Sequence, residues 1–302
     1  MGYLFLSLAL AAGITKGYCG KKTSYAIVSN SDSMIMNLLR MLICVLVGLA
    51  LTVVQDGFWA LKPDTFMIFA AALSGIASAA FVVSWLLSVR TGAYMMVEVF
   101  LLLGVIVTVV LCRIFFGEAI GAWQIAGMVM LVAAVYIMTA YNSSVKGRMS
   151  VSALVILMIC GLSYGISDFS QKIFTNNRPD GSVAAFNLYT YAFAALALVA
   201  AYFVFRKVDK RSGAQVRSPL NVIKPIWYFV LIMAVCLFAN SFFKTQAALH
   251  LDAVMLYPLN QGCAVVLSLL MSSILFKEKI NAKCIIGICL SFVALLMINL
   301  LK

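Results

Sequence analysis

The chain contains 302 residues, of which 64% are hydrophobic and only 11% are charged, and its formal net charge is +12. A soluble core cannot hide so large an apolar share, so these proportions exclude a soluble globular domain. The basic residues fall mainly in short connectors between apolar runs, where membrane topology accounts for them better than nucleic-acid binding does.

Apolar runs of about 20 residues follow one another along the chain, and each is long enough to cross the hydrocarbon layer as a helix. The first run lacks the positive start of a signal peptide, so we interpret it as a retained helix. Breaks at charged, Pro, Gly and Asn clusters predict helices over residues 3–21, 33–54, 65–89, 92–114, 121–141, 151–175, 183–205, 226–248, 251–276 and 282–301. We therefore expect an all-α integral membrane protein with ten transmembrane helices.

Three internal matches, in the same order and at nearly constant offset, indicate two related halves. GEAIGAWQIAG around Glu118 parallels KEKINAKCIIG around Glu278, and GITKGYCGKK parallels GLSYGISDFSQK. Asn37 in NLLRM parallels Asn187 in NLYTY. Because five helices is an odd number, the second half must enter the membrane upside down.

The predicted architecture is therefore a pair of inverted five-helix repeats, residues 1–145 and 146–302. Inverted repeats favour a solute site near the middle of the bilayer, between the halves.

The two copies, FFGEAIGAWQIAG and LFKEKINAKCIIG, make the chain resemble the EamA-like family of the drug/metabolite transporter superfamily. Arg40 also matches an arginine often found in the second helix of that family. The resemblance implies transport, a central cavity lined by the first four helices of each half, and peripheral fifth helices. It leaves the substrate open, since related members move amino acids, drugs, sugars, nucleotide-linked metabolites and quaternary amines.

Two departures from the family pattern affect the expected mechanism. Lys16-Gly17 stands where a Trp-Gly pair is common, so the floor of the cavity is expected to differ. Ile14 and Leu162 stand where the small multidrug relatives carry a proton-binding glutamate. This difference argues against a copy of their cation/proton exchange.

Charged residues inside the predicted helices are the leading candidates for a solute path. A charge at the centre of a transmembrane helix costs roughly 2.5 to 3.5 kcal/mol on insertion scales, so it usually faces a cavity or a partner. The candidates are Lys16, Arg40, Glu98, Asp168 and Lys244. The net charge of these five side chains is +1, which suits a zwitterionic or mildly anionic solute better than a lipophilic cation.

Glu98 lies one turn from Tyr94 in the fourth helix, and we interpret both as cavity residues, with Glu98 binding substrate or a proton. The alternatives are a static ion pair of Glu98 with a lysine or arginine of another helix (Lys16, Arg40 or Lys244), or a glutamate near the membrane interface that reaches water. Asp168 shares a helical stripe with Tyr164, Gln171 and Lys172, which is expected to meet protein or water. The plainer interpretation of Asp168 is an intrahelical pair with Lys172.

The eighth and ninth helices complete the candidate site. Asn240 lies one turn from Lys244, and Pro258 removes a backbone hydrogen bond among polar neighbours. The full set of candidate substrate-binding residues is Lys16, Arg40, Tyr94, Glu98, Tyr164, Asp168, Asn240, Lys244, Tyr257, Asn260 and Gln261.

Two further features have structural interpretations. The spacing Gly13/Gly17, copied at Gly161/Gly165, predicts close packing between helices of the two halves. Glu118 and its copy Glu278 are expected to cap the first amides of the helix that follows each of them. Eight isolated cysteines and a single histidine predict neither a disulfide framework nor a metal site, and we expect no cofactor.

Most connector Lys and Arg residues follow odd-numbered helices, so the positive-inside rule predicts that these connectors are cytoplasmic and both termini outside, although many family members are thought to have both termini inside. We expect a multi-pass protein of the cell inner or plasma membrane whose partners are the lipid bilayer, a small-molecule substrate and, through Glu98, protons. Nucleic acid is not an expected partner, and the oligomeric state is open.

The leading hypothesis is a secondary-active transporter of small polar or amphipathic metabolites, amino acids first, that works by alternating access. No GxxxxGK[ST] motif supports ATP-driven transport, and no HExxH or GxSxG motif supports an intramembrane enzyme. The alternatives are multidrug or quaternary-amine efflux and, from another class, a non-transporting membrane scaffold.

Overall fold

A computed structural model describes residues 1–23, 27–90, 94–139, 151–211, 218–276 and 282–300. Within these ranges the chain is helical, with α1 (Gly2–Thr23), α2 (Asn30–Asp56), η2 (Phe58–Leu61), α3 (Thr65–Arg90), α4 (Tyr94–Phe116), α5 (Ala122–Thr139), α6 (Val151–Asn177), α7 (Val183–Arg211), α8 (Pro219–Ile223), α9 (Trp227–Ala248), α10 (Ala253–Phe276) and α11 (Ala282–Leu300). All ten predicted helices are present at close to their predicted bounds.

Two short helices, η2 and α8, were not predicted, because each is a single turn or so within a connector. Five helical stretches in the described ranges are long and apolar enough to cross a membrane: Asn30–Asp56, Thr65–Trp85, Val151–Asn177, Val183–Arg211 and Trp227–Ala248. Shorter apolar stretches lie in α4, α5, α10 and α11. The all-helical membrane fold predicted from the sequence is confirmed.

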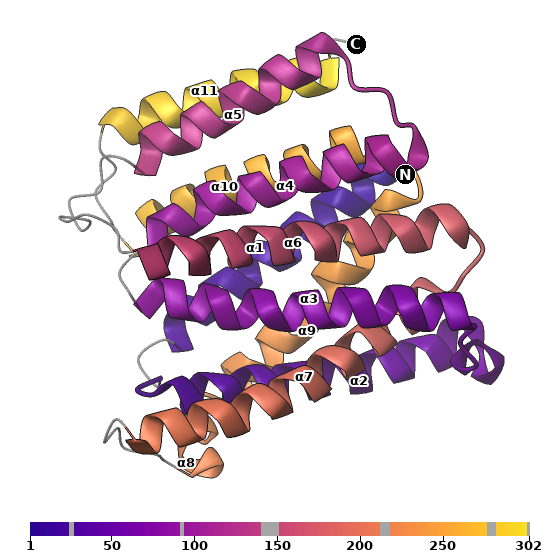
Figure 1. Cartoon of the computed structure of the whole chain (residues 1–302), viewed down its shortest axis with the longest axis vertical. Helices are drawn as coiled ribbons and strands as arrows, with labels where there is room; N and C mark the ends of the chain where they lie inside the picture. Colours follow the sequence, from indigo (N-terminus) through magenta and orange to yellow (C-terminus); the bar gives the residue numbers. More distant parts are fainter. Residues whose placement is uncertain (24–26, 91–93, 140–150, 212–217, 277–281, 301–302) are drawn as a thin grey trace.

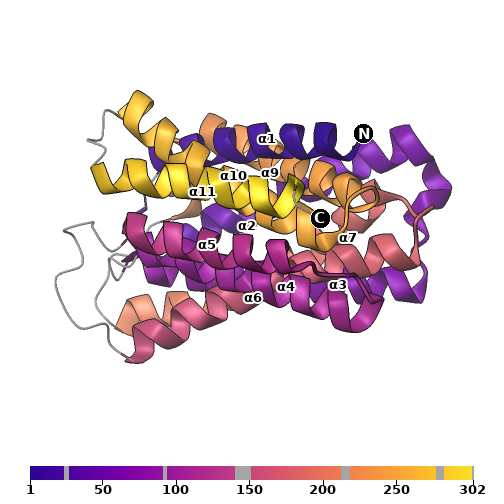
Figure 2. The same cartoon turned by 90° about the horizontal axis from the view of Figure 1, so that it is seen from above.

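The helices form two layers, seen from above in Figure 2, with α1, α9, α10 and α11 in one layer and α3, α4, α5 and α6 in the other. Paired α5 and α11 lie at one end of the molecule, and paired α2 and α7 lie at the opposite end (Figure 1). The place of α5 and α11 at the edge is what the family resemblance implies for the fifth helix of each half.

The contacts between the two halves follow the symmetry of an inverted repeat. The first helix of each half packs along the third helix of the other half, α1 on α9 and α6 on α3. The start of α1 and the end of α11 lie at the same end of the bundle (Figure 1), as an even number of crossings requires. The two halves therefore interlock.

The start of α2 shows how local chemistry fixes a helix boundary. Ser29 Oγ accepts a hydrogen bond from the Asp32 amide at 3.1 Å, and Asp32 Oδ2 accepts one from the Ser29 amide at 3.2 Å, which is a capping box. Asp209 at the end of α7 accepts a further bond from the Ser31 amide at 2.8 Å. These bonds begin α2 earlier than the apolar pattern predicts.

A close backbone contact between the two halves is made by glycines of α4 and α6, which lie in the same layer. A Cβ added to Gly161 would collide with the Phe100 carbonyl, and one added to Gly104 would collide with the Gly161 carbonyl. Thr108 Oγ1 donates to the Gly165 carbonyl at 2.9 Å across the same contact. The predicted packing role of Gly161 and Gly165 is confirmed.

The first-half copy behaves differently. Gly13 faces Asn240 of α9, while Gly17 is exposed. The prediction of close packing is therefore wrong for Gly17.

Candidate functional site

An ion pair between α6 and α9 lies at the centre of the site. Lys244 Nζ is 2.5 Å from Asp168 Oδ1, and both side chains are buried, with 8% and 1% of their surface exposed. The predicted pairing of Asp168 with Lys172 one turn later is wrong, because Asp168 is directed at α9. A buried charge pair is retained at a cost in desolvation, so it is a candidate for function more than for stability.

Lys172 instead binds at the junction of α9 and α10. Its Nζ donates to the carbonyls of Ala248 at 3.1 Å and Leu251 at 2.9 Å, and it is 3.4 Å from Glu118 Oε1. Glu118 Oε2 accepts the Ala253 amide at 2.7 Å. Glu118 therefore caps α10 of the other half, and the prediction that it caps the helix after it is wrong; Glu278 lies outside the described residues.

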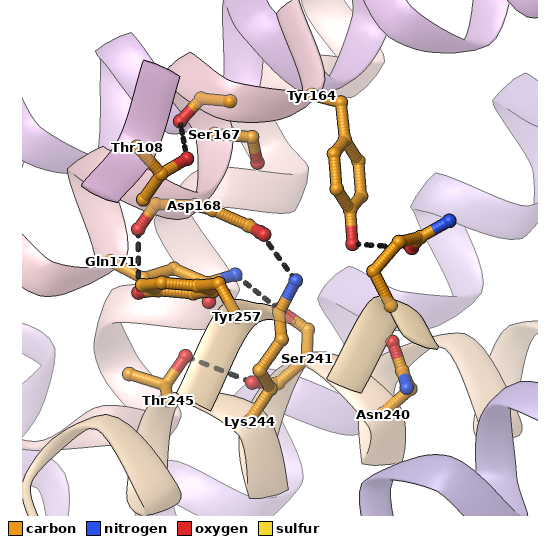
Figure 3. A network of polar contacts seen from close by, with 12 residues as sticks. Thr108, Tyr164, Ser167, Asp168, Gln171, Asn240, Ser241, Lys244, Thr245 and Tyr257 are labelled. Atoms are coloured by element: carbon orange, nitrogen blue, oxygen red, sulfur yellow. Dashed lines mark hydrogen bonds and ion pairs between the residues drawn. The ribbon is translucent and has the colours of Figure 1, made fainter. Parts of the chain in front are cut away.

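Aromatic hydroxyls and amides surround the ion pair (Figure 3). Tyr257 donates to the Asp168 carbonyl at 2.7 Å, and Tyr164 donates to Gln261 Oε1 at 3.2 Å. Lys244 Nζ also lies 5.4 Å from the centre of the Tyr164 ring, within range of a cation–π contact. Residues of α6, α9 and α10 that the sequence proposed as one site are thus brought together.

The matching asparagines of the two halves make the same local bond. Asn37 and Asn187 each donate Nδ2 at 2.9 Å to the carbonyl four residues earlier, which leaves each Oδ1 free to accept. Asn37 Oδ1 accepts from Arg40 Nη1 at 2.7 Å, whereas Asn187 Oδ1 accepts from Ser241 at 2.6 Å. The two halves therefore share the hydrogen bond from each asparagine to its own helix. They differ in the donor to the asparagine oxygen, which is a charged arginine in the first half and a neutral serine in the second.

Lys16 and Arg40 lie at a different depth along the bundle axis from the Asp168–Lys244 ion pair. Lys16 lies seven residues before the end of α1 and Arg40 ten residues after the start of α2, about 10 to 15 Å from the end of the bundle that carries the odd-numbered connectors. Asp168 and Lys244 lie toward the C-terminal ends of α6 and α9, and therefore nearer the end of the bundle that carries the even-numbered connectors. The charged residues are therefore spread along the bundle axis.

The side chains of Lys16 and Arg40 are partly exposed although both residues lie deep in the bundle. Lys16 is within Coulombic range of Arg40 and Lys244. The Nε atom of Arg40 is buried and has no hydrogen-bond partner. Within the described part of the chain, neither Lys16 nor Arg40 forms an ion pair with a carboxylate.

The remaining predicted residues are placed as follows. Asn240 donates to the Ala9 carbonyl at 2.7 Å and ties α9 to α1. Asn260 is buried in α10, and its Oδ1 has no partner. Tyr94 and Glu98 belong to α4, but their side chains lie outside the described part of the structure.

The end of the bundle that carries the even-numbered connectors is tied across the two halves. Arg178 Nε donates to Asp64 Oδ2 at 2.6 Å, Ser182 donates to Asp56 at 2.5 Å, and Tyr189 donates to the Leu61 carbonyl at 2.7 Å. A polar cavity of about 220 Å³ lies at this end, lined in part by Gln55, Asp56, Asp180, Ser182, Phe242 and Gln246.

Sequence reasoning missed several polar residues of the site. Ser241 links α9 to Asn187 and lies 3.5 Å from Gln171 Nε2, and Tyr191 donates to the Leu237 carbonyl at 3.1 Å. The available signal was weak: a hydroxyl one turn before a buried lysine, on a helix already proposed to line the path. Among the described residues, no group of three or more His, Cys, Asp or Glu side chains forms a metal site.

Apolar helices in two interlocked inverted halves, with buried charges between them, define a multi-pass membrane protein of the transporter class. Residues 151–300 match the EamA-like transporter family. The chain therefore carries an EamA-like transporter domain in its second half, as the sequence resemblance predicted. This family consists of transporters and is not an enzyme family, so the chain is a membrane transporter with a small-molecule substrate.

Solved structures share the fold of the whole chain. One crystal structure of a protein has a TM-score of 0.78 at 14% identity and covers 99% of this chain and 96% of that chain, and 28 solved chains match in all. At this identity the likeness concerns the fold alone. No curated protein matches the sequence.

Proposed function

We propose that the protein is a secondary-active transporter of small polar or amphipathic metabolites, amino acids first, that works by alternating access. The observation that carries the proposal is the Asp168–Lys244 ion pair, buried between α6 of one layer and α9 of the other. A pair held between layers can separate when the layers move, and a solute with both charges can replace either partner.

The ties at the even-connector end support a conformation in which that end is closed. Four cross-half contacts gather there: Asp64–Arg178, Asp56–Ser182, Leu61–Tyr189 and Glu118–Lys172. Lys16 and Arg40, nearer the other end, keep part of their surface exposed. Alternating access requires that these ties open when the opposite end closes.

The charges of the proposed site favour polar metabolites over the alternative of multidrug or quaternary-amine efflux. The site contains three cations and one described carboxylate, which disfavours a quaternary amine.

We propose that transport is coupled to the movement of protons. Glu98 is the sequence-based acceptor, and Asp168, whose Oδ2 is buried without a hydrogen-bond partner, is the acceptor among described side chains. Transport that is independent of a pH gradient would contradict this part of the proposal.

For location, we propose the cell inner or plasma membrane, with residues 1–145 and 146–302 as the two repeats and the odd-numbered connectors cytoplasmic. A C-terminal fluorescent fusion should stay dark if the C-terminus is outside. Fluorescence from a cytoplasmic C-terminus would overturn the orientation and leave the transport proposal intact.

The direct test uses purified protein in sealed liposomes and time-resolved flux of labelled amino acids, sugars and quaternary amines. Amino-acid flux above that of protein-free vesicles, lost in Lys244→Met and kept in the exposed control Lys62→Gln, is the expected result. A non-transporting scaffold gives no flux for any solute.

A further inference from the structure

We propose that Lys16 and Arg40 form a binding site for the anionic group of the substrate, so that the transported solute carries a carboxylate or phosphate group. This inference rests on the proposed transport function and specifies its substrate class. It starts from a charge imbalance among the described residues of the path.

Lys16 lies within Coulombic range of both Arg40 and Lys244, and the one described carboxylate that contacts any of these three cations is Asp168. Asp168 is already bound to Lys244, so the positive charges of Lys16 and Arg40 are not neutralised by a described side chain. Like charges held in a medium of low dielectric repel strongly. An anion bound between Lys16 and Arg40 removes this repulsion and replaces it with attraction.

The geometry of Arg40 is suited to that role. Its Nη1 donates to Asn37 Oδ1, a neutral acceptor that fixes the guanidinium without cancelling its charge. Its Nε is buried and unpartnered, so one face of the donor fork is left for a ligand. A guanidinium binds carboxylate or phosphate oxygens in pairs, which a single ammonium cannot do.

The neighbourhood also explains why the site selects an organic anion. Cys44 and Cys236 lie near Lys16, and Tyr191 lies near Arg40. Cys44 is engaged with the Ala234 carbonyl and Tyr191 with the Leu237 carbonyl, so these side chains present largely apolar surface to the site. A solute with an anionic end and a carbon skeleton matches both features.

Charge-matched probes test the site. Succinate and glycerol 3-phosphate supply carboxylate and phosphate oxygens, succinamide and glycerol are their neutral counterparts, and 1,4-diaminobutane is the cation. In a thermal-shift titration of the detergent-purified protein, at least one of the two anions should raise the unfolding temperature, and the neutral and cationic probes should not. Which anion does so distinguishes carboxylate from phosphate recognition.

The variants make the result specific. Arg40→Gln and Lys16→Gln should each weaken apparent anion affinity about tenfold or more, because each removes a charged hydrogen-bond donor. Arg40→Lys should lie between wild type and Arg40→Gln, and Lys62→Gln, at an exposed residue of a connector, should match wild type. Since the variants remove charges that have no ion-pair partner among the residues the structure describes, they are expected to fold.

Liposome flux separates this inference from the function beneath it. Flux of neutral or cationic solutes with no preference for anions would overturn the anion site and leave the transporter intact. Anion-dependent stabilisation with no flux of any probe would keep the site and overturn the transport proposal. Stabilisation by no anion, or anion affinity unchanged in both Gln variants, would also overturn the site.

Discussion

The first helices of the two halves, α1 and α6, are related by the internal repeat but differ in how they hold charge. On α6, Asp168 is buried and paired with Lys244, and Lys172 is buried and bonded to two carbonyls. On α1, Lys16 is partly exposed and has no carboxylate partner among the described residues. One first helix therefore holds its charges in fixed contacts, and we infer that the other carries a charge available to a ligand.

The backbone contacts differ in the same direction. Gly161 and Gly165 bring α6 against the backbone of α4, while of the matching glycines on α1 one faces a side chain and the other is exposed. We infer that α6 belongs to a rigid wall of the path and that α1 is the element freer to move. Four predictions test this contrast, from the largest expected effect to the smallest.

The largest effect is expected at the ion pair of α6. Asp168→Asn leaves Lys244 buried without a counter-charge, which costs about 3 to 5 kcal/mol of unfolding free energy. The double variant Asp168→Asn/Lys244→Met should recover much of that stability but not transport. Thermal unfolding and liposome flux measure the two effects separately; a double variant as unstable as the single one would show that the pair is not the cause.

A smaller effect is expected from matched glycine substitutions. Gly161→Ala places a methyl group against the Phe100 carbonyl, and such overpacking costs about 1 to 3 kcal/mol. At Gly13 the nearest atom to the new methyl group is Asn240 Nδ2 at 3.2 Å, the end of a side chain, so Gly13→Ala should be neutral within about 1 kcal/mol. Equal losses of stability in the two variants would remove the contrast between α1 and α6.

The cap on α10 comes next. Glu118→Ala removes the acceptor of the Ala253 amide and one partner of Lys172, and loss of a helix cap costs about 0.5 to 2 kcal/mol. Glu118→Gln, which keeps an acceptor oxygen, should lose less. The unfolding temperatures of the two variants in detergent measure the difference, and identical values would indicate that the cap contributes nothing.

The smallest effect concerns pH at the tied end of the bundle. The Met67 amide and Arg178 hold the pKa of the Asp64 carboxyl below its usual value of about 3.9. The carboxylate therefore contributes stability above that usual value, and the contribution is lost as pH falls through the lower pKa of the folded protein. Asp64→Asn should flatten the dependence of unfolding temperature on pH below about 4; an unchanged pH profile would contradict this.

The positions of the helices were predictable because an apolar run of membrane length has few alternative structures in lipid. The repeat was predictable because Glu118, Asn187 and their copies keep their places in the sequence. The ion-pair partners of the buried charged residues were not predictable from the sequence. Asp168 had a plausible partner one turn away at Lys172, and only packing of α6 on α9 brings it to Lys244.

The same limit explains the error at Glu118. A carboxylate at a helix junction fits the first amides of any helix whose start lies nearby, and sequence order favours the next one. Interlocking of the halves places the start of α10 closer. Charged residues inside apolar helices could thus be identified from sequence, whereas their pairing depends on an arrangement that local patterns do not encode.

The bond from Glu118 to the start of α10 also bears on how the chain is made. When Glu118 leaves the ribosome, the amide that it caps has not been synthesised, and the faces of α1 and α3 that pack on α9 and α6 are uncovered. The first half therefore cannot complete its packing in the membrane until the second half has been synthesised. A chain released before residue 151 would expose those faces to proteases and chaperones of the membrane, so the two repeats are expected to mature as one unit and not in succession.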